Sequence, residues 1–140
     1  MSLCYDVGVN AAGSPVHADL SRIAAATPGL GLLLLYGSRA RGDARTDSDW
    51  DFGYEADSTF DPDALLARLA DELKADKIDL TDLNRAGALL RHRAARHAVV
   101  LFEQTPGRFT RFWLNAVDTW CDLAPILEPI YAGVLEGLER

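Results

Sequence analysis

Residues 31–54 read GLLLLYGSRARGDARTDSDWDFGY, and this stretch decides the fold. Its first six residues form an apolar run bounded by glycines, which predicts a short buried β-strand over residues 31–36. A polar turn and loop follow. Over residues 49–54 polar and aromatic residues then alternate, which predicts a second strand with one buried face.

The alternation in residues 49–54 separates two sets of side chains. Residues two apart on a strand project from the same face, so Asp49 and Asp51 point one way and Trp50, Phe52 and Tyr54 are buried on the other side. Neighbouring carboxylates repel each other unless a cation lies between them, and Mg²⁺ favours carboxylate oxygens together with substrate phosphate oxygens. The plainer alternative is the solvent face of a strand, although aspartate is depleted in strands.

The turn after the first strand carries Gly37 and Ser38, at the position where a helix would start. A glycine there lets the backbone approach a phosphate, and the serine hydroxyl and exposed N–H groups can bind its oxygens. Arg39 and Arg41 add the positive charge that a triphosphate requires. The alternative interpretation is an ordinary helix-capping turn with solvated arginines.

A third carboxylate is expected from another strand, predicted over residues 77–83. Asp79 lies between Ile78 and Leu80, which would be buried together, so Asp79 should face the same way as the first pair. Asp82 has the opposite parity and lies near the strand end, where capping is its expected role. Asp79 is therefore the predicted third carboxylate, with Asp82 as the fallback.

The remaining pattern predicts an α/β (α+β) fold in a single domain, residues 1–140. A small mixed β-sheet over about residues 31–103 would have helices packed on one face, which leaves the other face free for polar chemistry. A last strand is predicted over 99–103, and helices are predicted over 17–27, 61–75, about 85–97, 108–122 and 125–138.

The composition limits the classes of partner and location. A net charge of −7 argues against stable nucleic-acid binding, although a small site on an acidic protein can still be locally positive. No apolar run approaches the roughly 20 residues of a membrane span, and the N-terminus does not resemble a secretory signal. Two cysteines, Cys4 and Cys121, are too few for a disulfide framework. A cytoplasmic protein with no membrane association is expected.

Two further segments carry notable patterns. Residues 91–97, RHRAARH, are the one basic cluster outside the turn; a solvated helix face is expected, with an acidic partner or nucleotide phosphates as the alternative. Trp113 and Trp120 share a helical face with Ala116 and Val117, which predicts a core or interface position.

The spacing Gly-Ser, ten residues, Asp-x-Asp resembles the signature of the DNA polymerase β-like nucleotidyltransferase superfamily. In this chain it is Gly37-Ser38, residues 39–48 and Asp49-Trp50-Asp51. The fuller string GSRARG…SDWD looks like the minimal nucleotidyltransferase (MNT) branch, and Asp79 matches the position of that family's third aspartate. The segments VVLFE and RFWLNAVDTWCDLAPI also resemble the C-terminal half of MNT antitoxins.

This resemblance implies a reaction in which a hydroxyl attacks the α-phosphorus of a nucleoside triphosphate, ATP by analogy, and releases pyrophosphate. It implies that Asp49, Asp51 and Asp79 are the catalytic residues and hold two Mg²⁺ ions. The implied nucleotide-binding residues are Gly37, Ser38, Arg39, Arg41 and Ser48.

The resemblance also implies a partner. MNT proteins are commonly paired with HEPN toxins, and transfer of AMP to a toxin tyrosine would make this chain the antitoxin. The alternatives are a nucleotidyltransferase that modifies a small molecule such as an aminoglycoside, and a non-enzymatic antitoxin that acts by occlusion alone.

Overall fold

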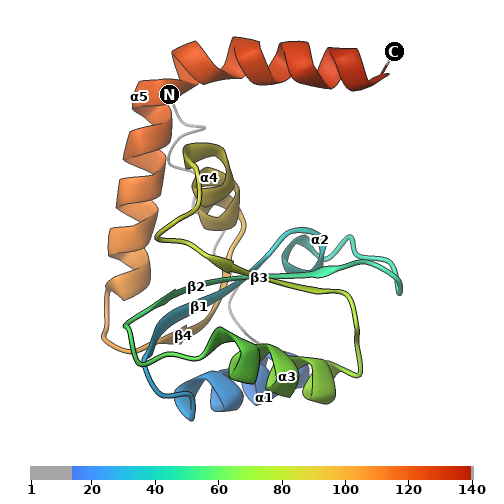
Figure 1. The fold of residues 1–140 in the computed structure, drawn as a ribbon, viewed down its shortest axis with the longest axis vertical. Coiled ribbons are helices and arrows are strands. Elements are labelled where there is room, and N and C mark those ends of the chain that lie inside the picture. Colours follow the sequence, from blue (N-terminus) through green and yellow to red (C-terminus); the bar gives the residue numbers. More distant parts are fainter. Residues whose placement is uncertain (1–13, 140) are drawn as a thin grey trace.

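The computed structural model describes residues 14–139, with side chains described as far as Val134. Helices and strands alternate along these residues (Figure 1). In chain order they are α1 (Pro15–Ala25), β1 (Leu30–Tyr36), α2 (Ser38–Arg41), β2 (Trp50–Ala56), α3 (Pro62–Leu73), β3 (Ile78–Asp82), α4 (Ala88–Arg96), β4 (Val99–Glu103) and α5 (Arg108–Glu139). Cys4, one of the two cysteines, lies outside the described residues.

The four described strands form one mixed sheet in the order β3–β2–β1–β4. β1 runs antiparallel to both β2 and β4, whereas β2 and β3 are parallel. The register pairs Tyr36 with Asp51 and Asp51 with Asp79, so these three residues form a row across β1, β2 and β3. Residues paired in register share a face, which confirms the predicted orientation of Asp79.

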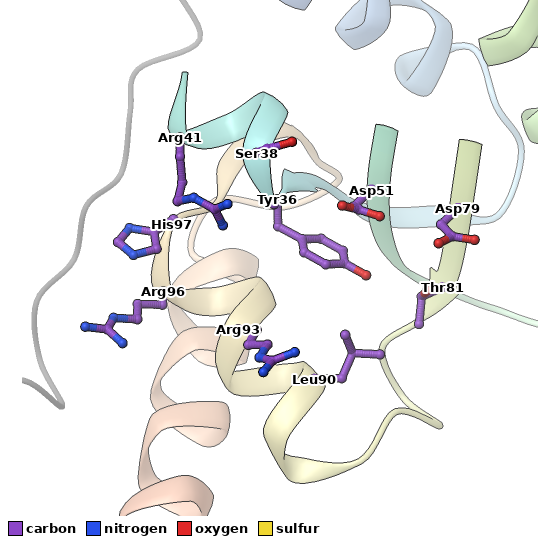
Figure 2. Close-up of a pocket in the computed structure, with 11 residues that line it drawn as sticks. Tyr36, Ser38, Arg41, Asp51, Asp79, Thr81, Leu90, Arg93, Arg96 and His97 are labelled. Atoms are coloured by element: carbon purple, nitrogen blue, oxygen red, sulfur yellow. The ribbon is translucent and has the colours of Figure 1, made fainter. Parts of the chain in front are cut away.

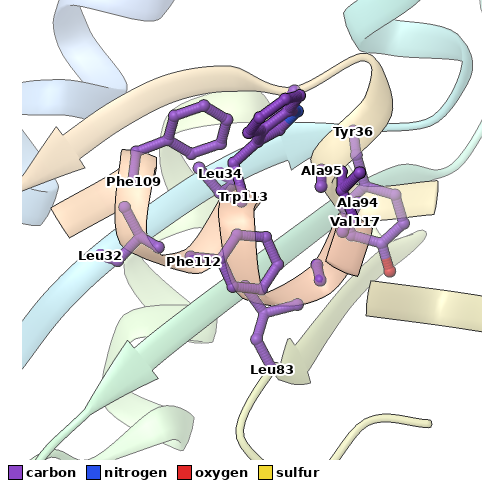
Figure 3. Close-up of a cluster of buried hydrophobic side chains, with 12 residues drawn as sticks. Leu32, Leu34, Tyr36, Leu83, Ala94, Ala95, Phe109, Phe112, Trp113 and Val117 are labelled. Carbon is purple, nitrogen blue, oxygen red and sulfur yellow. The ribbon is translucent and has the colours of Figure 1, made fainter. Parts of the chain in front are cut away.

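Helices cover both faces of this sheet, whereas the sequence pattern was expected to place them on one. Leu33 and Leu35 of β1 belong to a core cluster with residues of α1 and α3. Leu32 and Leu34 belong to a second cluster with residues of α4 and α5 (Figure 3). The physical reason is the continuous apolar run of β1, every residue of which is buried, because such a run is typical of a strand covered on both sides.

The alternating pattern of β2 is confirmed. Phe52 is fully buried in the cluster beneath α1 and α3, and Trp50 and Tyr54 pack against the same cluster. On the opposite face, Gly53 leaves room for Leu83, because a Cβ atom on Gly53 would lie 2.8 Å from Leu83 Cδ2. β2 is thereby held between two cores.

The C-terminal part forms one bent helix rather than the two that were expected. α5 continues through Pro125 and Pro129, and its direction changes sharply partway along (Figure 1). Proline lacks an N–H group and clashes with the preceding turn, so within a helix it bends the axis. Before the bend, Trp113 and Trp120 are buried as predicted. None of the helices within residues 14–139 is both long and apolar enough to span a membrane.

Replacing Phe52 by alanine is expected to lower the free energy of unfolding by about 3–5 kcal/mol, because a fully buried ring leaves a cavity between the sheet and two helices. Urea denaturation followed by circular dichroism measures the change. Leu114→Ala is the control, because Leu114 is 51% exposed and its truncation should have little effect. A Phe52→Ala protein as stable as the control would contradict the assignment of Phe52 to the core.

Candidate active site

A cavity of about 710 Å³ opens where the end of the sheet meets α2 and α4. Its sheet side is formed by Tyr36, Asp51, Asp79 and Thr81, which come from β1, β2 and β3 (Figure 2). The register places them side by side, since Asp51 pairs with both Tyr36 and Asp79. A side-chain hydrogen bond joins Tyr36 to Thr81, and burial raises the pKa of the Tyr36 hydroxyl. Two carboxylates on adjacent strands thus face one cavity.

The surroundings of Asp51 disfavour its negative charge. Partial burial raises the pKa of the Asp51 carboxyl, Asp79 and Asp49 raise it further, and Arg41 acts in the opposite direction. A bound cation would relieve the repulsion between these carboxylates, because an opposite charge stabilises the ionised form. Carboxylate oxygens are the ligands that Mg²⁺ prefers, so the chemistry of Asp51 and Asp79 fits this ion.

Asp49 does not line the cavity that Asp51 and Asp79 share. It precedes the first residue of β2, is exposed, and borders a second cavity together with Asp79. Its charge nevertheless reaches Asp51, whose pKa it raises. Within the described part of the chain, no three acidic, histidine or cysteine side chains are grouped closely enough to hold a metal ion. The structure therefore brings Asp51 and Asp79 together and leaves Asp49 at the rim.

The Gly37-Ser38 turn forms the next side of the cavity. Gly37 has φ 74° and ψ −158°, a conformation that is essentially restricted to glycine. A Cβ atom on Gly37 would lie 2.3 Å from Oδ2 of Asp51. Ser38 begins α2 as its first residue, and Ser38 and Arg41 both line the cavity. The turn and the carboxylate are thus packed directly against each other.

Arg39 and Ser48, two of the predicted nucleotide-binding residues, are not brought to this cavity. The Arg39 guanidinium donates hydrogen bonds to the carbonyl oxygens of Thr46 (3.2 Å) and Ser48 (3.0 Å), and it lies 4.5 Å from the centre of the Trp50 ring. The Ser48 hydroxyl accepts a hydrogen bond from the Arg45 backbone at 2.8 Å. These contacts direct both side chains into the loop that leads to Asp49.

Asp82 lies on the opposite face from Asp79, as the alternation predicted. Its carboxylate accepts a hydrogen bond from the Asn84 backbone at 2.9 Å, and it lies 3.7 Å from Nε of Arg85. Residues 83–87 consequently form the connection to α4, which begins at Ala88 rather than near Arg85. Asp82 has a turn-forming role outside the cavity.

The remaining side comes from α4, which the sequence interpretation did not assign to the site. Leu90, Arg93, Arg96 and His97 line the cavity opposite the sheet (Figure 2). The sequence feature that could have indicated this contribution of α4 is the basic segment RHRAARH, which was expected to be a solvated helix face. Arg93 and Arg96 of this segment are indeed exposed, but they border the cavity as well. Thr81 could have been found from its parity, since it lies two residues after Asp79.

The fold and this arrangement of turn and carboxylates define a class of enzyme. Residues 19–106 match the family described as "Polymerase beta, Nucleotidyltransferase", and the chain belongs to this family. It is therefore a nucleotidyltransferase. The resemblance and the α+β fold class inferred from the sequence are both confirmed.

More particular relatives lie within the same family. The chain is 32% identical to the Protein adenylyltransferase MntA of Aphanizomenon flos-aquae (strain 2012/KM1/D3) over 104 residues, which cover 65% of this chain and 69% of that protein. It also resembles a crystal structure of a toxin–antitoxin with AMP-PNP, with TM-score 0.66, 26% identity and coverage of 84% and 94% of the two chains. A structure of a toxin–antitoxin MntA–HpeT mutant has TM-score 0.71 at 23% identity, covers 85% and 98%, and supports the fold alone.

Proposed function

We propose that this chain is an antitoxin that transfers AMP from ATP to a tyrosine hydroxyl of a partner HEPN toxin. The observation that carries the proposal is the pairing of Asp51 with Asp79 on adjacent strands, facing one cavity with the Gly37-Ser38 turn. The similarity to a protein adenylyltransferase supports AMP as the transferred group and a protein as the acceptor. A cytoplasmic location belongs to the same proposal, because ATP and the acceptor would be met there.

The proposed reaction forms one bond and breaks one. The acceptor hydroxyl oxygen attacks the α-phosphorus and forms a new P–O bond. The bond between the α-phosphorus and the bridging oxygen breaks, and pyrophosphate leaves with the electron pair. The proton of the hydroxyl passes to a carboxylate oxygen of Asp79, which lies beside Asp51 and faces the cavity. The backbone and hydroxyl of Ser38, with Arg41, bind the leaving phosphates.

Asp49, Asp51 and Asp79 are the residues that would hold two Mg²⁺ ions. When bound, such ions stabilise the negative charge on the attacking and leaving oxygens. Burial raises the pKa of Asp51, and the charges of Asp79 and Asp49 raise it further, which supports this assignment because a bound cation would offset both effects. Asp49 lies at the exposed entry to β2, from which it would complete the set on the side away from α4.

A protein acceptor is supported by the surface of α5. Beyond the bend, Ile126, Ile130 and Val134 are four residues apart, so they share one helical face, and they are 64%, 57% and 56% exposed. An exposed apolar stripe of this kind on a helix marks a protein–protein contact. The similar structure with AMP-PNP is of a toxin–antitoxin, which supports a toxin as the partner.

The test is transfer by the purified chain to its HEPN partner in the presence of ATP and Mg²⁺. Intact-mass spectrometry should show the toxin heavier by whole AMP units, and tandem spectrometry should place the first unit on a tyrosine. Omitting ATP is the matched control, and the unmodified toxin should then keep its toxicity. Neutralisation without any mass change would contradict the enzymatic role, and AMP found on an aminoglycoside instead would establish a small-molecule acceptor.

A further inference from the structure

The cavity has a cationic side that faces its carboxylates. Arg93, Arg96 and His97 line the cavity from the side of α4. In Figure 2 Arg93 extends toward the strands that carry Asp51 and Asp79, His97 lies beside Arg41, and Arg96 extends outward past His97. Three arginines and a histidine therefore border a cavity that contains two carboxylates, on a chain whose net charge is −7. The site combines a place for cations with a place for anions.

The direction of this cationic side is set by the packing of α4. Ala94, Ala95 and Ala98 are at least 98% buried in the cluster shared with β1 and α5, so this face of α4 cannot turn outward. Arg91 adds a second anchor, because its guanidinium donates to the Leu83 carbonyl and to Oδ1 of Asn115. Arg93, Arg96 and His97 consequently border the cavity.

The arginines of α4 differ in how their charge is used. The Arg91 guanidinium stabilises the fold through the two hydrogen bonds described above, and it also lies 5.1 Å from the centre of the Phe112 ring. Among the side chains that the structure describes, none forms an ion pair or hydrogen bond with Arg93 or Arg96. Two arginines and a histidine with unused donors, held at one cavity, are suited to bind phosphate oxygens.

We propose that Arg93 and Arg96, with His97, bind the phosphate chain of the incoming nucleoside triphosphate. The proposal rests on the nucleotidyltransferase site described above and assigns α4 as a second phosphate-binding element beside the Gly37-Ser38 turn. The polyphosphate then lies between a cationic helix and the carboxylate strands. Guanidinium groups at this position also stabilise the charge that develops on pyrophosphate as it leaves.

The test measures nucleotide binding without an acceptor, so that no transfer takes place. Isothermal titration calorimetry compares ATP, AMP and inorganic tripolyphosphate, each with Mg²⁺, on the wild-type chain and on Arg93→Ala, Arg96→Ala and the double variant. Each single variant should weaken the binding of ATP and of tripolyphosphate by about 10-fold or more, since a hydrogen bond to a charged group is lost. The binding of AMP, which lacks the β- and γ-phosphates, should change much less.

Arg68→Ala is the matched control, because Arg68 is also an exposed arginine but lies on α3, which covers the opposite face of the sheet. Its affinity for ATP should equal that of the wild type, and all variants should melt at the wild-type temperature. Unchanged affinity for ATP in the double variant would overturn the proposal. If the double variant bound ATP normally but bound the toxin more weakly, the proposal would also be overturned, because the arginines would then bind the acceptor. A wild-type chain that binds ATP through Arg93 and Arg96 but modifies no toxin would contradict the proposed acceptor and leave this inference standing.

Discussion

Asp51→Asn is expected to reduce AMP transfer by about 10³-fold, because it removes a central negative charge of the group that would hold the metal ions. Asparagine has the same shape, and Asp51 is only half-buried, so the variant should fold. Its free energy of unfolding should equal or slightly exceed that of the wild type, since the repulsion by Asp79 and Asp49 is relieved. Initial rates of toxin modification, measured by intact-mass spectrometry, give the comparison.

β3 offers a matched pair of controls for this result. Asp79→Asn should lose transfer to a similar extent, because Asp79 pairs with Asp51 and faces the same cavity. Asp82→Asn, three residues further on the same strand, should keep wild-type activity, because its side chain serves a turn and an asparagine oxygen can still accept the Asn84 hydrogen bond. Equal loss in both variants would contradict the separation of the two faces, and full activity in Asp79→Asn would remove Asp79 from the site.

The alternation of side chains made much of this site predictable from the sequence. Period-two spacing assigned Phe52 to the core and separated Asp79 from Asp82, because side-chain direction in a strand is a local property. The Gly37-Ser38 turn was also found locally, as the end of an apolar run.

The position of α4 was not predictable in the same way. Helical spacing shows that Arg93 and His97 share a face, but what that face meets depends on how α4 crosses the sheet. That crossing is decided by long-range packing of Ala94 and Ala95 against β1 and α5. The packing of helices on both faces of the sheet, by contrast, could have been predicted, because a fully apolar strand such as β1 is typical of a sheet covered on both sides.

The direction of the Arg39 side chain is likewise a tertiary property. Adjacent to Ser38 in the sequence, Arg39 was grouped with the phosphate-binding residues. Residues two apart in a helix point to opposite sides, so Arg39 and Arg41 diverge, and the carbonyl groups of Thr46 and Ser48 bind the Arg39 guanidinium. A cation close to a motif in sequence therefore contributes to the site only if the helix presents it on the cavity side.

Gly37→Ala is expected to reduce AMP transfer by about 10²-fold, because the new Cβ displaces the carboxylate that the reaction requires. At Gly37 the added atom would lie 2.3 Å from Oδ2 of Asp51, too close for any ordinary contact, so Asp51 must move. The backbone, with φ 74° and ψ −158°, also disfavours alanine by about 1–3 kcal/mol. Activity and the free energy of unfolding should therefore both fall, as measured by initial rates and by urea denaturation.

Gly107→Ala separates these two effects. Gly107 also has positive φ, 87°, but a Cβ atom there would have no neighbour within 4 Å among the described residues, and Gly107 lies in the turn before α5. It should lose about 1 kcal/mol of stability and keep its transfer rate. If Gly37→Ala were as active as Gly107→Ala, the backbone conformation alone would explain why glycine occupies position 37. A selective loss of activity in Gly37→Ala would instead show that the turn leaves space for the Asp51 carboxylate, so that the phosphate-binding turn and the carboxylate form a single unit.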